Sequence, residues 1–70
     1  MSGAELEGLV GAVESHEREI SALTSTLERL GRDPAPGSRA QVLFFTAKLT
    51  RHRIAMALLE SRLAGAHATD

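Results

Sequence analysis

The chain has no cysteine, tryptophan or tyrosine, and only two prolines. Because cysteine is absent, neither a disulfide nor a cysteine-ligated zinc site can stabilise these 70 residues, a length at which one hydrophobic core is marginal. No apolar run reaches the roughly 18 residues of a membrane span, and the first residues lack the basic and apolar stretches of a signal peptide. We therefore expect one small soluble intracellular domain that is stabilised by helix packing or by association.

Charge is low overall but unevenly distributed along the chain. The formal net charge is −1, with −4 over residues 1–31 and +3 over residues 32–70. Segments of opposite sign favour folding back on each other, although exposed ion pairs contribute only about 0.2 to 1 kcal/mol each. The near-neutral charge and the absence of tyrosine and tryptophan argue against nucleic-acid binding. RNA binding therefore stays a minor alternative, with phosphate contacts from Lys48, Arg51, Arg53 and Arg62.

Residues 3–30 show the three–four spacing that is typical of a helix with one buried side. Ser2, followed three residues later by Glu5, predicts a capping box at the start, and Gly31 predicts a left-handed stop. Gly8 and Gly11 lie on the outward side, so we expect the first turns to fray. The positions of this three–four row, the inner seam of the first helix, are Leu6, Leu9, Val13, His16, Ile20, Leu23, Leu27 and Leu30.

Pro34 and Pro36 predict a loop over about residues 31–38, because proline within a helix removes a backbone hydrogen bond. Ser38 and Gln41 offer a second capping box, and a second helix is expected over about residues 39–64, followed by a loose tail at 65–70. A loop of this length folds two helices back antiparallel. The predicted fold is all-α, a single antiparallel two-helix hairpin over residues 1–70 that a partner chain completes. The inner seam of the second helix is Val42, Phe45, Leu49, His52, Met56, Leu59 and Leu63.

Alignment of the two seams about the loop predicts one register along the whole hairpin. It pairs Leu30 with Val42, Leu27 with Phe45, Leu23 with Leu49, Ile20 with His52, His16 with Met56, Val13 with Leu59 and Leu9 with Leu63. His16 and His52 then lie about one layer apart, so a shared metal or a pH switch has to be weighed. Two histidines are too few for a closed metal site. We interpret them as partly buried polar residues that fix the register.

The second predicted helix carries more apolar side chains than one helical partner can cover. Besides the seam, a different side of this helix carries Leu43, Phe44, Ala47, Ile54 and Leu58. A helix that is apolar nearly all round must be buried nearly all round, and the first helix covers only one side of it. We therefore predict that these five residues bind another polypeptide. Because the two apolar sides are similar in size, the pattern leaves open which of them closes the hairpin.

Few side chains suggest chemistry. The hydroxyl side chains of the first helix lie on its solvent side, and no base is placed to activate them as nucleophiles. We expect no enzymatic activity, no cofactor and no metal.

The chain has an acidic first helix, a loop with glycine and proline, and a second helix that opens near a glutamine, in the sequence Ser38-Arg39-Ala40-Gln41-Val42-Leu43-Phe44-Phe45. In this plan it resembles the small co-chaperones of the type III secretion needle subunit, of the YscE, PscE and AscE kind. The resemblance implies a hairpin in the bacterial cytoplasm that binds a larger helical-repeat chaperone. The pair would keep the needle protein monomeric and soluble until export, in a protein-transport system linked to virulence.

The leading alternative is a homodimeric four-helix bundle that serves as a scaffold or regulator, in which the surplus apolar face pairs with itself. A tight dimer at low micromolar concentration favours this alternative. A monomer, or a weak oligomer, favours a different polypeptide as the partner.

Overall fold

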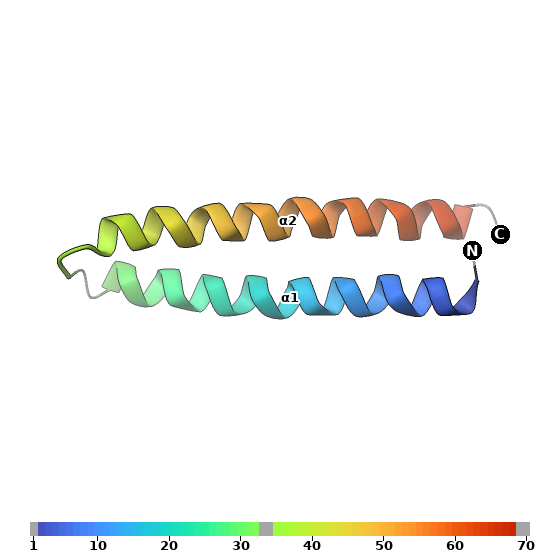
Figure 1. The fold of residues 1–70 in the computed structure, drawn as a ribbon, viewed down its shortest axis with the longest axis horizontal. Coiled ribbons are helices and arrows are strands. Elements are labelled where there is room, and N and C mark those ends of the chain that lie inside the picture. The colour runs from blue at the N-terminus through green and yellow to red at the C-terminus, as the bar shows by residue number, and fades with distance from the viewer. Residues whose placement is uncertain (1, 33–34, 69–70) are drawn as a thin grey trace.

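The protein is an antiparallel pair of long α-helices. The computed structural model describes residues 2–32 and 35–68, in which α1 spans Gly3–Arg32 and α2 spans Ser38–Ala68. The turn lies at one end of the molecule, so the start of α1 and the end of α2 lie together at the other (Figure 1). The predicted all-α hairpin is confirmed.

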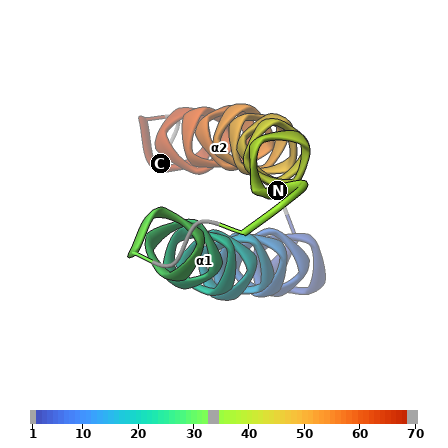
Figure 2. The ribbon, with the colours of Figure 1, turned by 90° about the vertical axis from the view of Figure 1, so that its left-hand side faces the viewer.

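The hairpin is long and thin. Its extents are 53 × 14 × 13 Å and its radius of gyration is 15.9 Å, whereas a compact chain of this length has a radius of about 11 Å. Figure 2 looks along the long axis and shows α1 and α2 as a single pair. Each helix therefore has one side against its neighbour, and the contact between them is the whole interior of the described residues.

The inner seams predicted for the two helices face each other. Every seam residue is buried or half-buried, and Leu23 and Leu49 are only 6% and 7% exposed. The apolar side chains of α1 are concentrated on one side, whereas those of α2 point to both sides. The structure therefore decides between the two apolar sides of α2, because the side that carries Leu49 closes the hairpin.

At the start of α1 the structure shows the Ser2 half of the predicted capping box, without the reciprocal bond from the Glu5 side chain. The backbone N–H of Glu5 donates to the Ser2 hydroxyl at 3.2 Å, and the N–H of Leu6 donates to the Ser2 carbonyl at 3.0 Å. The hydroxyl satisfies one of the four backbone donors that a helix leaves unpaired at its start. A single serine thus explains where this helix begins.

The predicted stop at Gly31 is wrong, because α1 continues through it to Arg32. Among the described residues, the glycine with a left-handed φ is Gly37, at +84°. A glycine inside a helix costs only about 1 kcal/mol relative to alanine. Arg29 and Arg32 in the last turn offset part of this cost, because their positive charges interact favourably with the helix dipole.

Ser38 begins α2 but does not form the predicted capping box with Gln41. Its hydroxyl accepts a hydrogen bond from the N–H of Ala35 at 2.7 Å, and its own N–H donates to the Ala35 carbonyl at 3.0 Å. The N–H of Gln41 donates instead to the carbonyl of Gly37 at 3.3 Å. The hydroxyl of Ser38, a residue that is only 8% exposed, therefore closes the turn through Ala35 rather than capping the helix.

The second helix is longer than predicted. It continues to Ala68, so the loose tail predicted at 65–70 is wrong for residues 65–68. Alanine is the best helix former, and three alanines within residues 64–68 offset the cost of Gly65. The tail positions 69–70 and the loop positions Asp33 and Pro34 lie outside the described residues.

Candidate protein-binding face

The side of α2 that points away from α1 is open to solvent and apolar. Leu43, Phe44, Ile54 and Leu58 are 66%, 60%, 58% and 63% exposed, and Ala47 between them is exposed as well. We call these five residues the outer face. The exposure expected from their spacing is confirmed, and their binding to a partner stays a prediction.

The two helices differ in how much apolar surface they leave uncovered. Among the large apolar side chains of the described part of α1, Val10 is the exposed one, at 42%. The four such side chains on α2 are each more exposed than Val10, and they extend over about four turns of one side. The open apolar surface of the hairpin therefore belongs mainly to α2.

Phe44 is held in place by two neighbours. Its ring meets that of Phe45 edge to face, with centroids 5.4 Å apart, and Phe45 lies half-buried in the seam. The Lys48 ammonium lies over the Phe44 ring, 5.6 Å from its centre. Such a cation–π contact contributes about 0.5 to 1 kcal/mol at an exposed site. An aromatic ring that is exposed and already positioned is well suited to anchor a protein interface.

A basic residue lies among the apolar side chains of the outer face. Charge alone groups Arg51 with the residues able to contact phosphates, but it lies four residues after Ala47 and three before Ile54. This spacing places it on the same side of α2, where it is exposed. The alternating spacing, rather than the residue type, is the signal that assigns Arg51 to this face.

His16 and His52 meet inside the hairpin. Their Nδ1 atoms lie 2.8 Å apart, the ring centroids are 5.1 Å apart, and the rings are inclined by 58°. The sequence places them about one layer apart, and the structure shows that the two rings are in direct contact. A side chain in such a seam fits between several residues of the facing helix, so it also touches a layer next to its paired one. One Nδ1 donates and the other accepts, which requires at least one neutral imidazole.

A pair of adjacent imidazoles raises the question of a metal site. In residues 2–32 and 35–68, no group of three or more histidine, cysteine, aspartate or glutamate side chains gathers that could hold a metal ion. Each Nδ1 is also engaged with the other ring. The arrangement therefore fits a polar contact that links the two helices.

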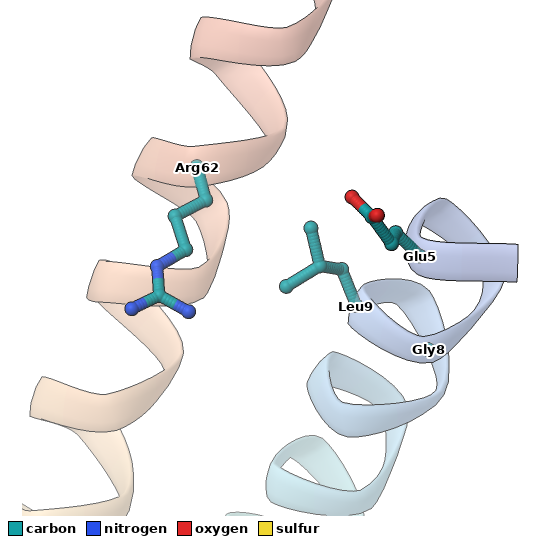
Figure 3. Close-up of a pocket in the computed structure, with 4 residues that line it drawn as sticks. All are labelled: Glu5, Gly8, Leu9 and Arg62. Carbon is teal, nitrogen blue, oxygen red and sulfur yellow. The ribbon is translucent and has the colours of Figure 1, made fainter. Parts of the chain in front are cut away.

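A shallow open depression lies where α1 begins (Figure 3). Glu5, Gly8 and Leu9 line it from α1, and Arg62 lines it from α2. A Cβ added at Gly8 would meet no atom within 4 Å. The depression is therefore open partly because glycine has no side chain to fill it. Glu5 and Arg62 have opposite charges, so the depression favours neither an anion nor a cation.

Comparison of the chain with protein-family models, with curated proteins and with solved structures finds no match. In the part of the chain that the structure describes, neither helix combines the length and the apolar character needed to cross a membrane. Function is therefore inferred from the geometry of the chain itself, above all from the exposed outer face.

Proposed function

We propose that this chain is a small binding protein that docks the outer face of α2 on a larger helical protein. The observation that carries the proposal is that Leu43, Phe44, Ile54 and Leu58 are each more than half exposed on the side of α2 opposite the seam. Large contiguous apolar patches are uncommon on proteins that stay monomeric, and they commonly mark interaction sites.

The total surface of the hairpin supports an additional partner. Its accessible surface is 5205 Å², whereas a compact monomer of the same mass exposes about 4,200 Å². The excess is comparable to the roughly 800 Å² that each partner buries in a protein–protein interface of standard size. A partner on α2 would thus complete the burial that a two-helix chain leaves unfinished.

The free energy available from the outer face is moderate. Full burial of a large apolar side chain contributes about 1.5 to 3 kcal/mol, so the remaining exposed fraction of each contributes about 1 to 2 kcal/mol. Leu43, Phe44, Ile54 and Leu58 together then contribute roughly 4 to 8 kcal/mol before the cost of association is subtracted. That cost is itself about 4 to 15 kcal/mol, so further contacts must decide whether the complex is stable.

The resemblance to the needle-subunit co-chaperones names a partner for this face. In that assignment, the hairpin binds a helical-repeat chaperone in the bacterial cytoplasm, and the pair keeps a type III secretion needle subunit monomeric until export. Helical-repeat proteins present long concave surfaces, which suit a rod of 14 × 13 Å cross-section. Binding would stabilise both partners by mass action.

The experiment is a pull-down from the native host followed by mass spectrometry. We expect a helical-repeat protein to co-purify with the wild-type chain and to be lost with the double variant Phe44→Asp/Ile54→Asp, because each carboxylate would be buried unpaired in the interface. The double variant should keep its helix content, since both side chains are exposed in the free hairpin.

The matched control is Thr46→Asp/Ala57→Asp, which adds the same two charges on exposed positions of α2 between the seam and the outer face. This control should retain the partner. Equal recovery of the partner with Phe44→Asp/Ile54→Asp would refute docking through the outer face. Recovery of a second copy of this chain, in place of a different protein, would favour the homodimeric bundle.

A further inference from the structure

Four of the five outer-face residues, all except Leu43, belong to a second row of three–four spacing on α2. Its positions are exposed, and all but one are apolar: Ala40, Phe44, Ala47, Arg51, Ile54 and Leu58. The spacing between them alternates between four and three residues, as in the seam on the opposite side of the helix. Arg51 is the one charged position, and it lies midway between Phe44 and Leu58.

Arg51 has no carboxylate near it on its own helix. The chain has no aspartate or glutamate between Pro34 and Leu59, so none lies three or four residues from Arg51 in either direction. The acidic helix α1 packs on the opposite side of α2, against Leu49 and its seam. Lys48 places a second positive charge near Phe44, beside the same face. The face is therefore apolar with a positive centre.

An arginine inside an apolar contact sets a requirement for the partner. The guanidinium group cannot lose its proton, and it carries five N–H donors that must be satisfied when water is excluded. A carboxylate accepts two of these N–H groups in a planar bidentate pair, which combines charge neutralisation with a fixed geometry. Burial against a purely apolar surface would leave the charge unpaired.

We propose that Arg51 is the specificity-determining residue of the outer face, and that this face binds a helix whose apolar row carries an aspartate or glutamate in the layer that meets Arg51. The proposal rests on the proposed function, because it concerns the same surface, and it adds the chemistry of the partner. A polar residue at a single layer of a helical contact sets register and partner choice in this way.

Arg51 also disfavours the binding of a second copy of this chain to the outer face. A parallel pair of α2 helices brings Arg51 against its own copy. An antiparallel pair that matches Phe44 with Leu58 also brings Arg51 against its own copy, because position 51 is the midpoint of the row. Two positive charges without a carboxylate would then meet in an apolar contact, which is unfavourable in both arrangements.

The probe is an Arg51→Glu variant of this chain, which offers the required apolar row with a carboxylate at the matching layer. Sedimentation and light scattering should find wild type alone and the variant alone mainly monomeric at 7.5 kDa. An equimolar mixture should form a heterodimer that is tighter than either self-association by about tenfold or more. Adding Phe44→Asp to the variant should abolish the heterodimer.

The matched control is Arg53→Glu, the same change of charge at an exposed arginine outside the row. Its mixture with wild type should stay monomeric. The proposal is overturned if the Arg51→Glu mixture associates no more than wild type alone, if the Arg53→Glu mixture associates equally, or if the added Phe44→Asp leaves the association intact.

This outcome is separable from failure of the proposed function. Loss of the native partner with Phe44→Asp/Ile54→Asp but not with Arg51→Glu would keep the docking face and refute the role of Arg51. Retention of the partner by both variants would refute both the docking through the outer face and the role of Arg51. Loss of the partner with Arg51→Glu and its retention with Arg53→Glu are the results expected if both hold.

Discussion

The substitutions Leu49→Ala and Leu58→Ala remove the same atoms from the two opposite sides of α2. Leu49 is 7% exposed in the seam, whereas Leu58 is 63% exposed on the outer face. Truncation of a buried leucine costs about 2 to 5 kcal/mol, and we expect the lower end because a two-helix hairpin relaxes easily. Leu58 has about a third of its surface covered, so its truncation should cost about 1 kcal/mol or less.

These magnitudes matter because the hairpin has little stability to lose. A core in a chain of this size supplies at most about 3 to 5 kcal/mol. Leu49→Ala should therefore leave a partly unfolded chain at room temperature, whereas Leu58→Ala should unfold near the wild-type urea concentration. Urea titration followed by circular dichroism measures both, at two protein concentrations to detect self-association.

Equal destabilisation by the two substitutions would refute the assignment of Leu49 to the seam and of Leu58 to the outer face. If the cost of Leu58→Ala grew with protein concentration, the outer face would be packed against a second copy. Loss of partner binding by Leu58→Ala at unchanged stability is the result that separates a docking residue from a folding residue.

The remaining predictions concern the glycines and the histidine pair. Gly8→Ala/Gly11→Ala should raise the free energy of unfolding in urea by up to about 2 kcal/mol, because alanine favours helix and neither added Cβ meets an atom within 4 Å. An unchanged or lower midpoint would contradict their outward placement. His16→Leu should lower the midpoint of urea unfolding more than His16→Leu/His52→Leu, because the single substitution leaves the half-buried Nδ1 of His52 without its partner at 2.8 Å. Equal midpoints of the two variants would show that this hydrogen bond contributes nothing to stability.

The seam could be predicted from the sequence because buried positions of a helix are occupied by apolar residues at regular intervals. Positions that meet the other helix, such as Leu23 and Leu49, recur at the helical period, and a single slip would bring polar side chains inward. The outer face follows from the same rule, since Phe44 and Ile54 recur at that period on the opposite side. The identity of the protein that binds there cannot be predicted from the spacing of apolar residues in this chain.

The helix ends could not be predicted to the residue because the energies that decide them are small. Gly31 stays helical at a cost of about 1 kcal/mol, which packing and charge in the last turn offset. The hydroxyl of Ser38 accepts a hydrogen bond from the N–H of Ala35 rather than from the N–H of Gln41. Local signals of this kind mark the region of a boundary rather than its residue.

The histidine contact required the assembled hairpin, whereas the place of Arg51 follows from the residue spacing along α2. Seam alignment predicts which layers face each other, but not which rings touch across neighbouring layers. The 2.8 Å contact between the Nδ1 atoms of His16 and His52 is visible only in the structure. Charge alone groups Arg51 with the residues able to contact phosphates, whereas its spacing from Ala47 and Ile54 already places it on the side of α2 that carries the outer face.

Site-specific photo-crosslinking in the native host tests docking through the outer face most directly. A photoreactive phenylalanine analogue replaces Phe44 in one strain and Thr46 in another, two exposed positions that are two residues apart on different sides of α2. The proposed docking predicts one defined adduct with a larger helical protein from position 44 and none from position 46. The same adducts from both positions, or an adduct from position 46 alone, would contradict it.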